Sequence, residues 1–496
     1  MRKVSSAVNP IITIDRHDEK PMHRQIYDEY CQAIATGTLR PGQQVPSTRG
    51  LAAELGISRI TVLNAYAQLL AEGYLQSRIG TGTTVSLALP DQSLPSGRRR
   101  RGDMSARRCA AMALAKRGPL FNSIESPPWA RKSGAFAVGQ VAFEQFPFPV
   151  WNSLVTRHCR NIRSRDLDYG DPMGLQALRE AIATYLRTAR GVHCESKQIM
   201  VVGGSQQALD ISVRALLNPN DRVWVEEPGY RFVRRIFALN RIHMVPVPVD
   251  DEGLNVAQGI KRCWKARAAF VTPSHQYPLG FTMSASRRLQ LLEWAERARA
   301  WILEDDYDSE YRYENMPIAS LQGLDQNASI IYIGTLSKVL FPSLRLGYMV
   351  IPSELVERFR RVRFAMDIGP PNFYQAVLAD FILEGHFARH IRRMRMLYRE
   401  RRNLLLANLY SRIGARLKVT GEQAGMHFCV MLDGICDQEV AKRAAAANLC
   451  LVPLSSSYIG KRSQHGFILG FASTAADTMP DAVKKLQSAL QFKIKI

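Results

Sequence analysis

The sequence lacks long apolar runs and cysteine spacings typical of metal sites or disulfide frameworks. No stretch reaches about 18 apolar residues without charges or helix breakers, and the N-terminus has no apolar segment like that of a signal peptide. The cysteines include no CxxC pair and no neighbouring histidine at metal-binding spacing, so we expect reduced, buried thiols and no metal. These absences predict a soluble, cytoplasmic protein without a membrane segment.

Acidic side chains are scarce relative to basic ones. The chain has 66 Lys+Arg against 44 Asp+Glu, a formal charge of +22, which favours anionic partners but specifies no fold. Its 496 residues, 46% of them hydrophobic, exceed the roughly 250–300 residues that one core supports, so we expect two or three globular units. The basic run Arg389–Arg402 is explained at least as well by a solvated helix face as by a nucleic-acid surface.

The N-terminal part has the pattern of three short helices followed by a hairpin. Pro21 begins the first helical pattern, and Gly37 ends it. Ser47 and Ser58 are typical N-caps of a second and a third helix, and Gly56 separates these two helices. Two helices joined by a short glycine-containing turn form a helix-turn-helix.

Apolar residues of the third helix recur at helical spacing and should pack against the first two helices: Val62, Ala65, Tyr66, Leu69 and Leu70. From this periodicity alone, any small three-helix module fits as well as a DNA-binding unit. Polar residues that favour DNA binding occupy the second helix and the start of the third, where a recognition helix meets base edges and phosphates. They are Arg49, Ser58, Arg59, Thr61 and Asn64.

The string LRPGQQVPSTRGLAAELGISRITVLNAYAQLLAEGYLQSRIGTGTTV closely resembles the winged helix of the GntR family. The resemblance implies operator DNA binding by Arg49, Ser58, Arg59 and Thr61. The hairpin of this segment has a glycine tip, and the resemblance implies that Gly80 and Gly82 lie close to the DNA backbone. We assign residues 1–86 to this DNA-binding domain.

A change of composition follows. Residues 87–132 include LPDQSLPSGRRRRGD and read as a flexible basic linker, in which Arg98–Arg101 is more simply a solvated tract than a phosphate contact. In residues 133–496 helical patterns alternate with short β-rich runs such as IMVVGG and WILEDD. This alternation predicts an α/β fold with a largely parallel sheet.

Two segments of the large domain combine a strand end with polar groups. In GGSQQALD a helix begins at Ser205 after two glycines, which favours phosphate binding, although such a turn alone is weak evidence. In ILEDDYDSE a buried strand ends in acids that include Asp305, followed by Tyr307. An acid at this edge of a sheet fits a metal site or a helix cap equally well.

A third segment, YIGTLSKVLFPSLRLGY, places Lys338 after a strand, and Arg345 follows seven residues later. A lysine here is usually a surface residue. Together with Ser205, Asp305 and Tyr307, however, it supplies an amine for a Schiff base, a carboxylate for a pyridinium nitrogen, a phenol and phosphate donors. These are the requirements of pyridoxal 5'-phosphate (PLP). Partial desolvation would lower the pKa of the amine and make it nucleophilic.

Residues 135–490 resemble fold-type I aminotransferases, most specifically in the pattern SKxxxPxxRxGY. The resemblance implies a Schiff base on Lys338, a ring-nitrogen contact from Asp305 and a ring-hydroxyl contact from Tyr307. It places Tyr230 beside the ring and Tyr169 at the phosphate of a neighbouring subunit, which implies a homodimer. The implied phosphate ligands are Ser205, Gln206, Ser337 and Arg345.

The order of winged helix, linker and aminotransferase-like domain resembles the MocR/GabR subfamily of GntR regulators. The string SHQYPLG strengthens this resemblance and implies that His275 and Gln276 line the cofactor pocket. A loop histidine whose hydrogen bonds are simply satisfied fits about as well.

One residue departs from the family pattern. Ile468 stands where the family usually has an arginine that holds a ligand carboxylate in a bidentate pair. Efficient transamination of ordinary amino acids is therefore not expected, and a ligand without that carboxylate, or PLP itself, fits better. Three other arginines are candidates to replace the missing one from another direction: Arg231, Arg234 and Arg235.

These observations predict a transcriptional regulator that binds operator DNA and senses PLP or a small amine or amino-acid-like effector. An active aminotransferase with a DNA-binding appendage is the alternative. A DNA-binding module on an empty aminotransferase fold is disfavoured because Lys338 and Asp305 are present.

Overall fold

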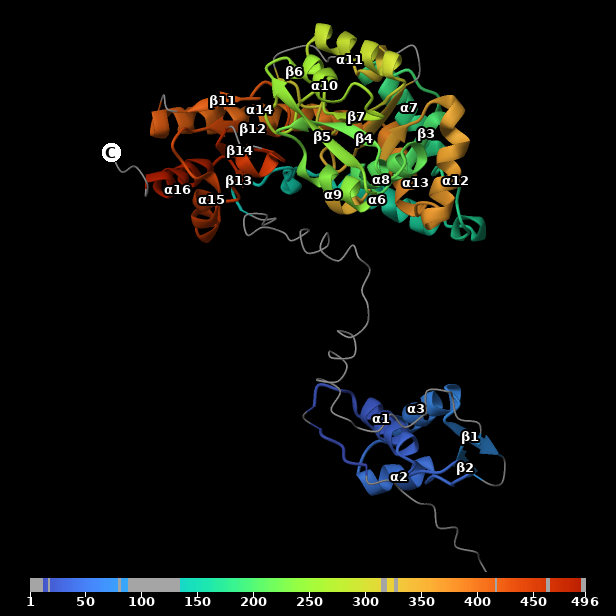
Figure 1. The fold of residues 1–496 in the computed structure, drawn as a ribbon. Coiled ribbons are helices and arrows are strands. Elements are labelled where there is room, and N and C mark those ends of the chain that lie inside the picture. Colours follow the sequence, from blue (N-terminus) through green and yellow to red (C-terminus); the bar gives the residue numbers. More distant parts are fainter. Residues whose placement is uncertain are drawn as a thin grey trace, which may run out of the picture. The chain divides into compact units, whose positions relative to one another are not determined.

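The computed structural model describes residues 12–16, 18–78, 82–87, 134–313, 319–324, 329–414, 417–460 and 464–491. The chain divides into two compact units, Met1–Ala115 and Lys116–Ile496, which are described separately (Figure 1). The predicted linker lies outside the described residues apart from Leu87, and so does Gly80. In the described ranges, no helix combines the length and the apolar character needed to cross a bilayer.

The N-terminal unit contains the three predicted helices and the hairpin. Its elements are α1 (Met22–Ala35), α2 (Thr48–Leu55), α3 (Arg59–Ala71), β1 (Leu75–Arg78) and β2 (Gly82–Val85), and the two strands pair antiparallel. The predicted N-caps are confirmed: the Ser47 hydroxyl accepts from the Gly50 N–H at 3.1 Å, and the Ser58 hydroxyl accepts from the Ile60 N–H at 3.3 Å. Gly56 ends α2 in the left-handed conformation, with φ 63°.

The core of this unit packs α3 against α1 and α2. Val62, Ala65 and Leu69 are buried as expected, and the hydroxyls of Tyr30 and Tyr66 share a buried hydrogen bond of 2.8 Å. The expectation for Leu70 is wrong: its side chain is 37% exposed. Leu69 and Leu70 are adjacent on the helix, and only Leu69 points into the core, because successive helical residues face about 100° apart.

The larger unit is built on an eight-stranded sheet with the order β3-β10-β9-β8-β7-β4-β5-β6. Strands β4, β5, β7, β8 and β9 run parallel, whereas β10 is antiparallel to both β3 and β9. The prediction of a largely parallel sheet is therefore confirmed. The strands are β3 (Ile199–Val202), β4 (Arg222–Glu227), β5 (His243–Asp250), β6 (Gly253–Leu254), β7 (Ala268–Val271), β8 (Trp301–Asp306), β9 (Ile330–Thr335) and β10 (Gly347–Val350).

Helices cover both faces of this sheet (Figure 1). In β3, Ile199 and Val201 pack against one layer of helices, and the alternate residues Met200 and Val202 pack against the other. Strands buried on both faces explain the continuous apolar runs of the sequence. The helices are α6 (Phe148–Arg160), α7 (Gln176–Arg190), α8 (Ser205–Leu216), α9 (Arg231–Leu239), α10 (Val256–Cys263), α11 (Ala285–Ala298), α12 (Val356–Asp367) and α13 (Phe373–Leu383).

A second, smaller sheet follows in the C-terminal part of the same unit. Its four antiparallel strands have the order β11-β12-β14-β13 and pack with helices around a core of their own. The elements are α14 (His386–Ile413), β11 (Lys418–Thr420), β12 (His427–Met431), α15 (Asp437–Ala446), β13 (Val452–Pro453), β14 (Gly466–Gly470) and α16 (Met479–Gln491). Strand β12 brings His427 to the edge of the cavity described below.

Candidate functional site

A cavity of about 480 Å³ lies at the carboxyl ends of the parallel strands of the large sheet. Ligands of open α/β sheets bind at this edge, because the loops that follow the parallel strands converge there. The cavity brings together the following residues that the sequence predicted for a cofactor: Ser205, Gln206, Tyr230, Asp305, Tyr307, Ser337, Lys338 and Arg345.

Lys338 follows the end of β9, and its ammonium nitrogen Nζ donates to the Gly139 carbonyl at 3.0 Å. Burial lowers the pKa of Lys338, and the nearby carboxylates of Asp308 and Asp305 partly oppose this shift. Gly139 has φ 73°, and a Cβ there would clash with Nζ. A lowered amine pKa is what a lysine needs in order to attack an aldehyde.

Asp305 lies near the end of β8 and faces the same cavity. Its oxygen Oδ1 is buried and has no hydrogen-bond partner among the described residues. Burial is the main cause that raises the pKa of Asp305 to about 7, with Asp306 and Glu226 adding to the shift and Lys338 opposing it. An orphaned buried carboxylate is the group that would pair with the protonated ring nitrogen of PLP, so the residues fit this cofactor.

The opposite end of the cavity is suited to a phosphate group. Helix α8 begins at Ser205, and Gly204 before it has φ 115°, a conformation that favours glycine. The first N–H groups of a helix have no partner within it and attract anions. The guanidinium of Arg345 lies over this turn, since a Cβ on Gly204 would meet its nitrogen at 3.5 Å. Ser205, Gln206 and Ser337 line the same region as Arg345.

His275 and Gln276 do not line the cavity, contrary to expectation, although both are buried next to it. The reason is that both satisfy buried acids: Nδ1 of His275 lies 3.0 Å from Asp308, and the Gln276 amide donates to Glu226 at 3.2 Å. Tyr277, the next residue along the chain, lines the cavity instead.

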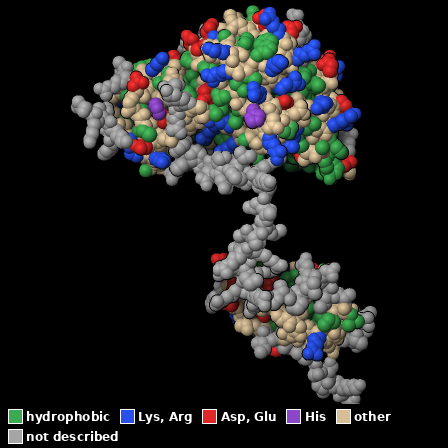
Figure 2. All heavy atoms as spheres, viewed as in Figure 1, with side chains coloured by type: hydrophobic (Ala, Val, Ile, Leu, Met, Phe, Trp, Pro, Cys, Tyr) green, Lys and Arg blue, Asp and Glu red, His purple; other side chains and the backbone are tan. Residues whose placement is uncertain are grey.

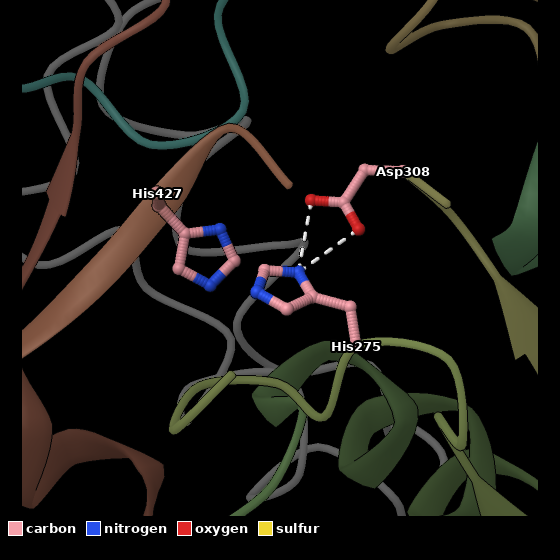
Figure 3. Close-up of side chains that lie close together, drawn as sticks. All are labelled: His275, Asp308 and His427. Atoms are coloured by element: carbon pink, nitrogen blue, oxygen red, sulfur yellow. Dashed lines mark hydrogen bonds and ion pairs between the residues drawn. The ribbon is translucent and has the colours of Figure 1, made fainter. Parts of the chain in front are cut away.

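His275 forms a group with two residues that sequence reasoning missed, Asp308 and His427. His275, Asp308 and His427 each offer one polar atom, and these atoms lie within 4.8 Å of one another (Figure 3). The oxygens of Asp308 already accept from Nδ1 of His275 and from the Met426 N–H at 3.2 Å. Asp308 adjoins Tyr307 in the sequence and could have been noticed, but His427 comes from the smaller sheet, where no motif marks it.

The structure also places the residues connected with the missing arginine. Ile468 is fully buried in β14, and it is not part of the cavity wall. Arg234 donates to the carbonyls of Ser457 and Tyr458 and so connects α9 to the C-terminal part of the larger unit, which contains the smaller sheet. Arg231 and Arg235, in contrast, line the cavity and give it positive charge from the side of α9.

Tyr169 lies outside the cavity, and its side chain is 81% exposed. Its predicted contact with the phosphate of a neighbouring subunit stays a prediction.

The predicted DNA-binding residues lie on the surface of the N-terminal unit. Arg49, Ser58 and Arg59 are exposed and Thr61 is half-buried, while Gly82 begins β2 with φ 86°. The Ser58 hydroxyl caps α3, which limits its freedom to contact DNA. Sequence reasoning missed Ile60, whose side chain is 70% exposed at the start of α3 and can contact a thymine methyl group.

On the larger unit, basic side chains are dispersed. Figure 2 shows Lys and Arg on the visible face interspersed with acidic and apolar side chains rather than gathered in one patch. Within the run Arg389–Arg402, Arg401 and Arg402 are buried, and Arg399 donates to the Tyr313 carbonyl at 2.5 Å. Part of this run therefore serves packing, which neither of the two sequence interpretations included.

Known protein families match both the N-terminal unit and the larger unit of the chain. The family of bacterial regulatory proteins of the gntR type matches residues 22–85, and aminotransferase class I and II matches residues 135–486. The probable rhizopine catabolism regulatory protein MocR of Rhizobium meliloti is 39% identical over 97% of this chain and 96% of its own length. The pyridoxine biosynthesis transcriptional regulator PdxR of Corynebacterium glutamicum is 30% identical over 97% of this chain and 98% of its own.

Among solved structures, kynurenine aminotransferase of Pyrococcus horikoshii, in complex with PMP, superposes with a TM-score of 0.69 and 27% identity over 80% of this chain and 99% of its own. The fold and the site thus define a GntR-type DNA-binding domain joined to a fold-type I aminotransferase domain. The chain belongs to the MocR-type transcriptional regulators of the GntR family.

Proposed function

We propose that this regulator holds PLP in the cavity of its larger unit and changes its operator affinity when PLP or a small amine or amino-acid-like effector binds there. The observation that supports this most is the pairing of a buried lysine, Lys338, with an orphaned buried carboxylate, Asp305, in one cavity. An amine for the aldehyde and a carboxylate for the ring nitrogen of one cofactor thus line the same cavity.

PLP supplies an aldehyde that reacts with amines and a ring that withdraws electrons. Lys338 would hold the aldehyde carbon, and Asp305 would keep the ring nitrogen protonated. The start of α8 and Arg345 would bind the phosphate, and Tyr230 would lie beside the ring. Because the lysine and the effector amine compete for the same aldehyde, an amine that displaces Lys338 frees its side chain, which gives the domain two distinguishable states.

The effector class follows from the charges around the cavity. Ile468 is buried away from the cavity and offers no charge to a ligand. An acidic group of an effector would therefore pair with Arg231 and Arg235 on α9. An amine without an acidic group, or PLP itself, needs neither arginine. The relative PdxR is connected by name with pyridoxine biosynthesis, which agrees with the cofactor as the signal.

Operator binding is proposed for α3 and the hairpin, with residues 1–86 as the DNA-binding domain, 87–132 as the linker and 133–496 as the effector domain. A homodimer, with Tyr169 reaching the partner's phosphate site, predicts two half-sites in the operator.

An active aminotransferase is the second candidate, because the aromatic-amino-acid aminotransferase 1 of Thermococcus litoralis is 27% identical over 73% of this chain and 88% of its own length. Multiple turnover with a panel of amino acids and keto acids would favour this candidate. Half-reactions without turnover would favour the regulator.

The test uses the purified full-length protein. We expect a visible Schiff-base absorption that Lys338→Ala abolishes, and borohydride reduction followed by peptide mapping should find the cofactor on Lys338. Lys197→Ala is the matched control, since Lys197 is an exposed lysine paired with Glu195, and it should keep the band. A colourless wild-type protein after addition of PLP would reject the cofactor assignment.

A further inference from the structure

At the cavity wall, Tyr307, His275 and Asp308 form a buried chain of hydrogen bonds. The hydroxyl of Tyr307 lies 3.0 Å from Nδ1 of His275. The same Nδ1 lies 3.0 and 3.2 Å from the two carboxylate oxygens of Asp308. Tyr307 and Asp308 line the cavity, and the side chains of His275 and Asp308 are each 1% exposed. A hydrogen-bond network this deeply buried is restricted to few arrangements of its protons.

The position of the proton on His275 follows from its partners. Both oxygens of Asp308 face N–H groups, since they lie 3.0 and 3.2 Å from Nδ1 and one of them also accepts from the Met426 N–H at 3.2 Å, so Asp308 is the acceptor of this pair. Nδ1 of His275 must therefore carry the proton that binds Asp308. The other ring nitrogen, Nε2, is buried and has no partner in the described part of the chain. A bare lone pair there costs less than an unsatisfied N–H, so the tautomer with its hydrogen on Nδ1 is favoured.

This tautomer fixes the direction of the Tyr307 hydroxyl. Since Nδ1 is a donor, the oxygen of Tyr307 accepts from it, and the hydroxyl hydrogen must point elsewhere. Burial, with Asp308 as the next cause, raises the pKa of Tyr307 well above its ordinary value, so the hydroxyl keeps this hydrogen. The open direction is the cavity that Tyr307 lines.

We infer that His275, anchored by Asp308, is a positioning residue that makes Tyr307 a hydrogen-bond donor toward the ring oxygen of the cofactor. This inference rests on the proposed binding of PLP. It assigns a role to His275, which does not line the cavity, and to Asp308, which does. It also explains why His275 lies behind the wall instead of in it.

The other groups around His275 support the same arrangement. The rings of His427 and His275 have centroids 5.0 Å apart (Figure 3). Burial is the main cause that lowers the pKa of His427 well below its ordinary value, and the neighbouring His275 and Lys338 add to this shift. The His427 ring is therefore neutral. The other charged groups that act on Tyr307 are Asp305, which belongs to the cofactor site, and Glu226, which accepts from Thr272 and Gln276. Among the described residues, Tyr307 and Asp308 are the two acceptors that share the Nδ1 hydrogen.

A donor to the ring oxygen stabilises the negative charge on that oxygen, so the Schiff-base nitrogen loses its proton more easily. Removing the donor should raise the pKa of the Schiff base by about one unit, the size expected for one hydrogen bond to a charged oxygen. This pKa is measured by titrating the visible band of the full-length, PLP-loaded protein with pH, without any turnover.

The decisive comparison is His275→Leu against His275→Asn. Leucine removes the Nδ1 donor that orients the Tyr307 hydroxyl, whereas the Asn side-chain N–H₂ can replace this Nδ1 donor. We expect the pKa to rise by about one unit in H275L and to stay within a few tenths of the wild-type value in H275N. An unchanged pKa in H275L, or an equal rise in both variants, would overturn the inference, because the second result is what a purely structural role gives.

Two further variants complete the test. In a Tyr307→Phe background, H275L should add no further shift, because the donor that His275 orients is already absent. If H275L does not fold, His275→Ala removes the Nδ1 donor instead, leaves the charges around the Schiff base unchanged and should also raise the pKa. A wild-type protein without a visible band would overturn the proposed cofactor together with this inference. A normal band with an unshifted pKa in H275L would overturn the inference alone.

Discussion

At the scale of single residues, Asp305 shows how a binding site costs stability. In the cofactor-free protein its Oδ1 has no described partner, and its pKa is raised from 3.8 to about 7, mainly by burial. Between these two values the folded state binds a proton that the unfolded state has lost. The contribution of Asp305 to the stability of the cofactor-free protein therefore decreases as the pH rises through this range.

We expect Asp305→Asn to stabilise the cofactor-free protein by on the order of 1–3 kcal/mol at pH 8 and by much less near pH 5, where the native Asp305 is already protonated. Thermal midpoints of both proteins across this pH range measure the difference. The neighbouring acid provides the control, since Asp306 accepts from Arg190 at 2.7 Å and from Tyr332 at 2.6 Å. Asp306→Asn should destabilise the protein, because it leaves the buried Arg190 without its counterion. Stabilisation that does not depend on pH would contradict this account of Asp305.

At the scale of secondary-structure elements, α3 is the predicted recognition helix, and its first turn exposes Arg59 and Ile60. Arg59→Ala should weaken operator binding about tenfold and reduce the salt dependence by about one released counterion, while the Schiff-base spectrum stays unchanged. Fluorescence anisotropy with labelled operator DNA at several salt concentrations measures both quantities.

The control for Arg59→Ala must remove one positive charge elsewhere. Arg214 is half-exposed on the larger unit and pairs with Asp210 there, so Arg214→Ala changes the net charge equally without altering α3. Equal losses of operator affinity in the two variants would mean that net charge, and not the recognition helix, determines binding.

The elements also show what could be predicted from the sequence. The strand ends that carry Ser205, Asp305 and Lys338 were predictable, because apolar runs mark buried strands and polar motifs follow them directly. His427 was not, since it lies on a strand of the smaller sheet and reaches the cavity only through the tertiary fold. His275 was predicted to line the cofactor cavity, but it lies behind the residues that do so. Its hydrogen bond to Asp308, which holds it there, could not be predicted from the sequence.

At the scale of the whole molecule, the DNA-binding unit and the cofactor cavity belong to different compact units of one chain. Regulation therefore requires a coupling free energy between two separate sites. Such couplings are usually 1–3 kcal/mol, which corresponds to a change in affinity of about 5- to 150-fold. The dispersed basic side chains on the visible face of the larger unit give no sign of a second DNA-binding patch on that face (Figure 2).

Coupling between binding equilibria is reciprocal, and this gives the last prediction. If PLP or an amine effector changes operator affinity by a given factor, operator DNA must change the affinity for that ligand by the same factor. Operator titrations with and without ligand measure the first factor, and spectral titrations of the cofactor with and without operator DNA measure the second. Lys338→Ala should bring the amine-dependent factor to about one, because in the proposed mechanism an amine acts through the aldehyde that Lys338 would hold. Equal operator affinities in the wild-type protein with and without PLP and amines would leave the cavity without a regulatory role, and the aminotransferase reading would then account for its buried lysine and carboxylate.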